Sequence, residues 1–300
     1  MKILEEWFIK APWGKIAMVS WGNPRGDPVL LVHGRQDSLN TFLPLLEYLP
    51  EKYYYVALDL PGSGKSDDFP IGVMVTRLLA VSALDVVIKH LKWDHFVYIG
   101  HSMGAETGLF YHAMNPHKIS KLILLEVKPG LLRLQMKNLP EYFKAFYDTY
   151  YSNYASYITD GRRYTRDQAI QAVMRARGMT REQAELILQR NLVPVGDKYK
   201  LSWDKRQKVL APINFEDEYY IELFTSDTPT LYINASESKF QYYNEGKPAV
   251  DAILAGLQRK SKYMYTVEVE GGHDVHFTNP ERVEKAVCAF LCKDFGQSKL

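Results

Sequence analysis

Short apolar runs that end in turn residues alternate along the chain with segments of helical spacing. The first two runs, residues 5–10 and 15–21, alternate polar and apolar positions around Pro12-Trp13-Gly14, which predicts an antiparallel hairpin. The later runs are continuously apolar, as is typical of strands buried on both faces of a parallel sheet. They lie at 29–32, 54–58, 96–99, 122–125, 230–233 and 264–269. Helical spacing covers 73–91, 103–114, 249–257 and 281–291. The alternation predicts an α/β fold in which a mostly parallel, eight-stranded sheet has helices on both faces.

The strand pattern is interrupted once, for about a hundred residues of helical spacing. Two helices in this stretch have clear starts, because Thr165-Arg166-Asp167-Gln168 and Thr180-Arg181-Glu182-Gln183 are capping boxes. We therefore expect a core made of residues 1–128 and 227–300, with residues 129–226 inserted as a helical cap.

Composition narrows the choice of partners. The 37 basic and 35 acidic residues balance without a basic tract, so nucleic acid is not an expected partner. Cys288 and Cys292 are the only cysteines, too few for a disulfide framework, and no metal site is expected. No apolar run approaches the roughly 20 residues that span a bilayer, and the N-terminus lacks the pattern of a signal peptide. The sequence therefore predicts an intracellular chain without a membrane span.

The last three residues match a targeting signal. Ser298-Lys299-Leu300 matches the tripeptide that the peroxisomal import receptor reads at a free C-terminus. The sequence therefore predicts this receptor as a partner and the peroxisome as the location, with the chain otherwise cytoplasmic.

The apolar run 96–99 leads into Gly100-His101-Ser102-Met103-Gly104 and then into helical spacing. A strand, a Gly-x-Ser-x-Gly turn and a helix in this order are the context of a nucleophile elbow. The flanking glycines let neighbouring backbone pass close to a strained serine while its Oγ projects into a cleft. We therefore expect Ser102 to be a nucleophile, with the start of the following helix directed at a developing oxyanion.

The run 29–32 ends in His33-Gly34-Arg35. We expect the backbone amide of Arg35 to bind an oxyanion together with the amide of Met103. His33 and Gly34, at the same turn, are expected to border the substrate. A tight turn without a further role is the alternative.

The last strand is followed by Gly271-Gly272-His273, and His276 comes three residues later. A loop histidine after a glycine pair can reach back over the strand ends as a general base. We expect His273 to take this role. His276 is the alternative, and we expect it to pack or hydrogen-bond locally.

Together these motifs resemble the α/β-hydrolase superfamily and, within it, the serine hydrolase-like family of animals. The resemblance covers nearly the whole chain and includes two further stretches, Asp59-Leu60-Pro61-Gly62-Ser63-Gly64-Lys65-Ser66 and Asn279-Pro280-Glu281-Arg282. It implies a cap over the site and a hydrolase activity whose substrate is not assigned.

The acid of the triad departs from the usual pattern of the superfamily, in which it follows the seventh strand as G-x-x-D. The corresponding stretch is Ala235-Ser236-Glu237-Ser238, with serine at the acid position and glutamate one place earlier. Glu126, at the end of the run 122–125, is a second candidate, because a side chain there points into the cleft. Related dehalogenases also place their acid after the sixth strand. We expect Glu126 to be the acid and keep Glu237 as the alternative.

Aromatic residues recur at i, i+4 spacing in the insertion, and we expect Phe146 and Tyr150 to line an apolar pocket. Ordinary packing within the cap is the alternative. Glu106, one helical turn after Ser102, is expected to pair with a basic neighbour, and lining a polar corner of the pocket is the alternative.

These residues predict a serine hydrolase that cleaves an ester or thioester of a hydrophobic acyl group through an acyl-enzyme, with Ser102, His273 and Glu126 as its triad. Because the nucleophile and its base are side chains of the chain itself, no cofactor is expected. Two alternatives stay open: a ligand-binding protein or receptor on the same fold, and an acyltransferase.

Overall fold

The computed structural model describes residues 1–129, 140, 144–159, 161–208, 215–238 and 243–296. Eight strands form one sheet in the order β1-β2-β4-β3-β5-β6-β9-β10. Their bounds are β1 Ile3–Ala11, β2 Gly14–Gly22, β3 Pro28–Val32, β4 Tyr54–Leu58, β5 Phe96–His101, β6 Ile119–Leu125, β9 Thr230–Ala235 and β10 Met264–Val269. β2 runs antiparallel to both β1 and β4, and the other neighbours are parallel. The predicted eight-stranded, mostly parallel sheet is confirmed.

Helices surround this sheet and continue above it. Those packed with the core are α1 Leu43–Leu46, α2 Arg77–Leu91, α3 Met103–Met114, α9 Asp217–Phe224, α10 Tyr243–Lys260, α11 Val275–Thr278 and α12 Glu284–Cys292, with the short turns η1 Leu39–Phe42 and η5 Pro280–Arg282. Those of the insertion are η3 Lys144–Asp148, α5 Thr149–Ser152, α6 Tyr154–Ile158, α7 Arg166–Arg177, α8 Arg181–Asn191 and η4 Lys205–Lys208.

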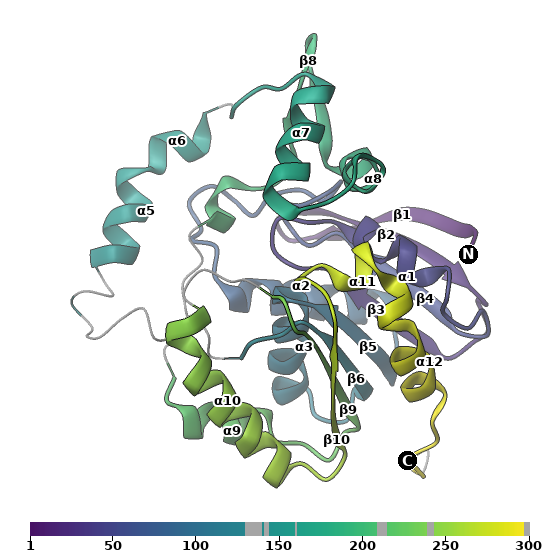
Figure 1. Cartoon of the computed structure of the whole chain (residues 1–300). Coiled ribbons are helices and arrows are strands. Elements are labelled where there is room, and N and C mark those ends of the chain that lie inside the picture. The colour runs from purple at the N-terminus through teal and green to yellow at the C-terminus, as the bar shows by residue number, and fades with distance from the viewer. Residues whose placement is uncertain (130–139, 141–143, 160, 209–214, 239–242, 297–300) are drawn as a thin grey trace.

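Successive residues of the buried strands face opposite layers. In β3, Leu30 and Val32 pack in one cluster with residues of α2 and α3, while Val29 and Leu31 pack in a second with residues of α1 and α12. This explains why the central strands are continuously apolar, since both of their faces are covered. Figure 1 shows α9 and α10 at one side of the sheet and α12 at the other.

The inserted elements α5 to α8 gather above the core (Figure 1). Both predicted capping boxes are confirmed, because the hydroxyls of Thr165 and Thr180 accept from the amides of Gln168 and Gln183. The insertion also holds a hairpin, β7 Leu192–Val195 and β8 Lys198–Leu201, where helical patterns alone were expected. Its turn contains Gly196 at φ 62°.

One helix of the range 129–226 packs with the core. Tyr220 and Phe224 of α9 lie in the same buried cluster as residues of α3 and α10. The ring of Phe224 is 5.1 Å from that of Phe110 on α3. α9 therefore serves as a layer of the core, although the sequence pattern assigned it to the cap.

Three arginines of the insertion join it to the core. Arg190 of α8 contacts the buried carboxylate of Asp59. Arg206 of η4 contacts Asp204 and donates to the backbone carbonyls of Pro70 and Val73, at 2.8 and 2.9 Å. These contacts tie cap and core together through buried charge rather than through apolar surface alone.

The third cap arginine, Arg177 at the end of α7, bridges two carboxylates of the core. Its Nη2 is 2.8 Å from Asp37 Oδ2 and 2.7 Å from Asp274 Oδ1, and its Nε donates to Asp274 Oδ2 at 2.9 Å. The paired guanidinium holds the pKa of Asp274 well below its usual value against the effect of burial. Asp274 directly follows His273, so the cap contacts the loop that carries the expected base.

We predict that Arg177→Met lowers the free energy of unfolding by about 3–5 kcal/mol, because it leaves two buried carboxylates without their counter-charge. Urea unfolding of full-length protein measures this. Arg181→Met is the matched control, since Arg181 pairs with Asp167 and Glu185 at the surface and its loss is expected to leave the midpoint unchanged. Equal midpoints for both variants would show that the Arg177 bridge does not stabilise the fold.

Candidate active site

Ser102 lies at the sharp turn between β5 and α3, with its backbone at φ 52° and ψ −118°. A Cβ on Gly104 would stand 2.2 Å from the carbonyl oxygen of Val32, and one on Gly100 would stand 2.6 Å from the Cα of Ala105. Residues without Cβ are therefore required on both sides of the serine. The Ser102 amide donates to the carbonyl of Leu125 at 2.9 Å, which anchors the turn to β6.

His273 reaches this serine from the loop after β10. Its Nε2 is 2.9 Å from Ser102 Oγ, and its Nδ1 is 3.2 Å from Glu126 Oε2. Since an ionised carboxylate only accepts, Nδ1 carries the ring proton and Nε2 accepts from the serine hydroxyl. This is the tautomer that a base acting on Ser102 requires.

Glu126 follows β6 with its backbone at φ 56°, and its side chain is 1% exposed. Oε2 also accepts from the Ser238 hydroxyl, while Oε1 accepts from the amide of Ala235 and lies 3.4 Å from Lys128 Nζ. Burial raises the pKa of Glu126, but the charge of Lys128 and the hydrogen bonds from His273, Ser238 and Ala235 outweigh it and hold the pKa below its usual value. The carboxylate is therefore charged where it meets the imidazole.

The two candidate acids, Glu126 and Glu237, lie in different surroundings. Glu237 is exposed, and its backbone amide donates to the carbonyl of Gly271 at 2.9 Å. Ser238, at the usual acid position, instead donates its hydroxyl to Glu126. The geometry brings Glu126 and not Glu237 to the ring of His273.

The turn after β3 lies against the nucleophile. A Cβ on Gly34 would stand 3.1 Å from the Cβ of Ser102. Within the described residues, no backbone hydrogen bond is donated by the amides of Arg35 or Met103. Neither expected oxyanion donor is thus committed to a backbone acceptor among these residues.

The two other expected histidines are held in the core. His33 is fully buried, accepts at Nε2 from the Leu60 amide at 2.9 Å and donates from Nδ1 to the Gly34 carbonyl at 2.7 Å. Burial lowers its pKa, so the neutral ring braces the turn, and with both nitrogens engaged it has no polar atom for the expected substrate contact. His276 is fully buried and contacts Thr41 Oγ1 through Nε2 at 2.9 Å, in line with the local role expected for it.

A second polar cluster lies beneath the triad and was not anticipated. Asp37, His101 and Asp274 bring three potential metal-ligand atoms together. The guanidinium of Arg177 already contacts both carboxylates, so an arginine supplies the positive charge there. His101 donates to the carbonyl of His273 at 3.0 Å, and burial lowers the pKa of its ring to about 4. This neutral ring supports the loop of the expected base.

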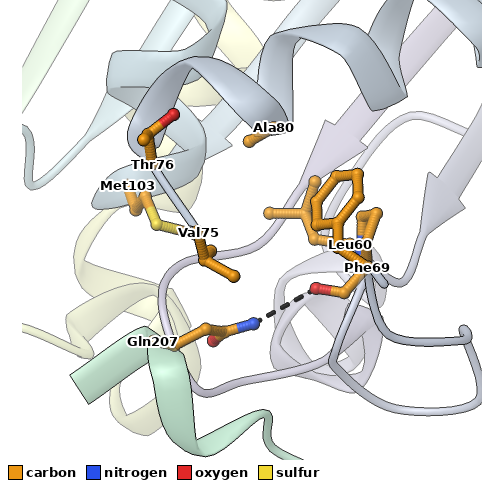
Figure 2. Close-up of a pocket in the computed structure, with 8 residues that line it drawn as sticks. Leu60, Phe69, Val75, Thr76, Ala80, Met103 and Gln207 are labelled. Carbon is orange, nitrogen blue, oxygen red and sulfur yellow. Dashed lines mark hydrogen bonds between the residues drawn. The ribbon is translucent and has the colours of Figure 1, made fainter. Parts of the chain in front are cut away.

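A pocket lined by Met103, the residue after Ser102, lies between core and cap (Figure 2). Its lining is mostly apolar and consists of Leu60, Pro61, Phe69, Val75, Thr76, Ala80, Met103 and Gln207. Gln207 comes from η4, and its side-chain amide donates to the Pro61 carbonyl at 3.2 Å. The cap thus closes one side of a pocket whose other side includes the residue after the nucleophile.

Tyr150, expected to line an apolar pocket, is not among these lining residues. Tyr150 is buried, and its hydroxyl donates to the carbonyls of Ile71 and Val73, each at 3.2 Å. Its ring packs against Tyr154 and Tyr157. Tyr150 therefore anchors the cap to the loop before α2. Phe146 was also expected to line the pocket, but its side chain lies outside the described residues.

No helix among the described residues is both long and apolar enough to cross a membrane. Residues 27–280 match the model of a family described as having the alpha/beta hydrolase fold. The chain is therefore an α/β-hydrolase.

Similar proteins show to which family of α/β-hydrolases the chain belongs. The chain is 30% identical over 302 residues to human serine hydrolase-like protein 2, covering 96% of this chain and 94% of that protein, and 29% identical to mouse serine hydrolase-like protein, covering 97% and 96%. The chain belongs to the serine hydrolase-like family. A solved thioesterase domain from the curacin biosynthetic pathway superposes with a TM-score of 0.77 at 21% identity, over 96% of this chain and 99% of that one, which shows the shared fold.

Proposed function

We propose that this hydrolase cleaves a carboxylic ester or thioester through a covalent acyl-enzyme, with Ser102, His273 and Glu126 as its triad. The observation that carries the proposal is the unbroken path from Ser102 Oγ to His273 Nε2 at 2.9 Å and from Nδ1 to Glu126 Oε2 at 3.2 Å. A strained serine, a correctly oriented imidazole and a buried carboxylate together form the arrangement used in nucleophilic acyl transfer.

In the first half-reaction His273 takes the hydroxyl proton as Ser102 Oγ bonds to the substrate carbonyl carbon. The carbonyl oxygen becomes an oxyanion, which the amides of Arg35 and Met103 stabilise. The intermediate collapses, the proton passes from His273 to the departing alcohol or thiol, and the acyl group stays on Ser102. Water, deprotonated by the same imidazole, then releases the carboxylic acid and restores the serine. Glu126 stabilises the imidazolium formed in each half.

The pocket beside Met103 suits the acyl part of the substrate. Its lining is mostly aliphatic and aromatic, and it includes Met103, one of the two proposed oxyanion donors, but not His273, where the leaving group departs. Such a lining binds hydrocarbon by removing it from water. The proposed substrate class is therefore an ester or thioester with an apolar acyl chain.

We predict that a fluorophosphonate probe labels the protein and that Ser102→Ala abolishes labelling, because Ser102 combines a strained turn with an imidazole, His273, that a buried carboxylate orients. Mass spectrometry of the labelled chain measures this. Ser156→Ala, which removes an exposed cap hydroxyl, is the control and is expected to label fully. Labelling that survives Ser102→Ala contradicts the assignment, and a single slow turnover of acyl esters in place of steady hydrolysis contradicts an enzyme.

We predict that Glu126→Gln lowers kcat/KM for an acyl ester by roughly 10²-fold or more, since the neutral amide cannot stabilise the imidazolium. Glu237→Gln, an equal change on an exposed neighbour, is expected to have little effect. A large loss in Glu237→Gln alone would reassign the acid.

Ser238 allows a stricter form of this test, because its Oγ contacts the same Glu126 oxygen that meets His273. A carboxylate at position 238 can therefore replace that of Glu126. We expect Glu126→Gln/Ser238→Asp to recover roughly 10-fold of the activity lost in Glu126→Gln, as a partial restoration of the imidazolium's counter-charge. Glu126→Gln/Ser238→Asn, of similar shape without charge, is expected to recover none. Equal activity of the two double variants would show that charge at this point does not matter.

We also propose that the chain is carried into peroxisomes by the import receptor that reads Ser298-Lys299-Leu300, residues that lie outside the described part of the chain. Full-length protein with a fluorescent reporter at its N-terminus is expected to co-localise with a peroxisomal marker. Removal of residues 298–300 is expected to disperse the signal. A diffuse signal that the deletion does not change would refute peroxisomal targeting.

A further inference from the structure

Arg35 places an uncommitted positive charge beside the nucleophile. It directly follows Gly34 in the turn that contacts Ser102, and its side chain is exposed to solvent. Its Nη1 lies 3.4 Å from the backbone oxygen of Gln207, a residue that lines the pocket together with Met103. The guanidinium therefore lies where cap and core meet at the pocket.

A second guanidinium lies close by. Arg77 begins α2 directly after Thr76, another lining residue, and its partly buried head contacts the carboxylate of Glu106 on α3. Its buried Nε has no hydrogen-bond partner within the described residues. Burial, with a contribution from the charge of Arg35, lowers the pKa of Arg77 to about 10. The positive charge of Arg35 thus acts on Arg77.

Among the residues that the structure describes, the charges at this point do not balance. Arg35 and Arg77 bring two positive charges, and Glu106 supplies one negative charge. By contrast, each of the three arginines that join cap and core contacts a carboxylate; they are Arg177, Arg190 and Arg206. In the described part of the chain no ion pair involves Arg35, and although its side chain is exposed, partial desolvation without a compensating charge lowers its pKa. Removing an unpaired charge from water is unfavourable, so a nearby anion would be bound favourably.

We propose, building on the ester or thioester hydrolysis proposed above, that Arg35 and Arg77 bind a carboxylate at the far end of the acyl chain, so that the substrate is a half-ester or half-thioester of a dicarboxylic acid. The apolar pocket holds the methylene chain, and the guanidiniums hold its terminal charge. The anion belongs to the acyl side because Thr76 and Met103 line this pocket, whereas the leaving group departs beside His273.

The test compares kcat/KM for two esters of equal length, monomethyl adipate, which ends in a carboxylate, and methyl hexanoate, which ends in a methyl group. The wild-type protein is expected to favour monomethyl adipate by roughly 10-fold or more, since a hydrogen bond to a charged group contributes about 1.5–3 kcal/mol. Arg35→Gln is expected to lower this ratio by roughly 10-fold, chiefly through KM, and Arg35→Lys to keep part of it. Arg25→Gln, an exposed arginine on a distant turn, is expected to leave the ratio unchanged.

Glu106→Gln gives a change of opposite sign. It removes the carboxylate that offsets Arg77, so the preference for the anionic ester is expected to rise. A wild-type ratio near one, or a ratio that Arg35→Gln does not lower, overturns the anionic subsite while Ser102-dependent hydrolysis of both esters leaves the proposed function intact. A preference that appears only for an ester whose alcohol carries a phosphate places the anion on the leaving group and equally overturns the proposal. Loss of all ester hydrolysis together with loss of probe labelling would instead refute the proposed function.

Discussion

The close packing of three backbone segments around Ser102 determines the rest of the site. The end of β3, the end of β5 and the start of α3 approach so closely that a Cβ on Gly34, Gly100 or Gly104 would meet neighbouring atoms at between 2.2 and 3.1 Å. This packing holds Ser102 at a positive φ, a conformation that costs about 1–3 kcal/mol in a residue with a side chain. Because the turn is over-determined from three directions, Oγ and the amide of Met103 are fixed before any substrate arrives.

The adjacency of β6 and β9 explains how Glu126, the proposed acid, can reach His273 from an unusual strand. The two strands run parallel, and the Glu126 amide donates to the carbonyl of Ile233 at 2.8 Å. Their carboxyl ends therefore open at the same point, so a side chain from either strand can approach Nδ1 of His273. Glu126 takes the position, and Ser238, where the superfamily usually has its acid, becomes a hydrogen-bond donor to it. Ser238 has no carboxylate, and its hydroxyl instead stabilises the carboxylate of Glu126 by a hydrogen bond.

Local sequence patterns were enough to predict the central strands, two helix starts and the bend at Ser102. Continuous apolar runs identified the buried strands, the two capping boxes identified the starts of α7 and α8, and strand-turn-helix spacing identified the bend at Ser102. The β7–β8 hairpin escaped because its strands are short and only partly buried, so they lack the apolar run that marks the central strands. His33 was misjudged as a substrate contact for another reason: its partners are backbone groups of Leu60 and Gly34 that only the folded turn brings to both ring nitrogens.

The arginines show why charge is the hardest property to place from sequence. Arg177 and Asp37 are 140 positions apart, and nothing in the local sequence of either distinguishes this buried pair from surface charges. Only the fold separates arginines that have carboxylates, such as Arg177, from Arg35, which has none in the described part of the chain. Because desolvation makes an unpaired charge costly, a partly desolvated arginine without a carboxylate at a pocket carries more information than the pairs. Pairing accounts for Arg177 through the architecture of cap and core, whereas the charge of Arg35 is accounted for by the proposed anionic end of the substrate.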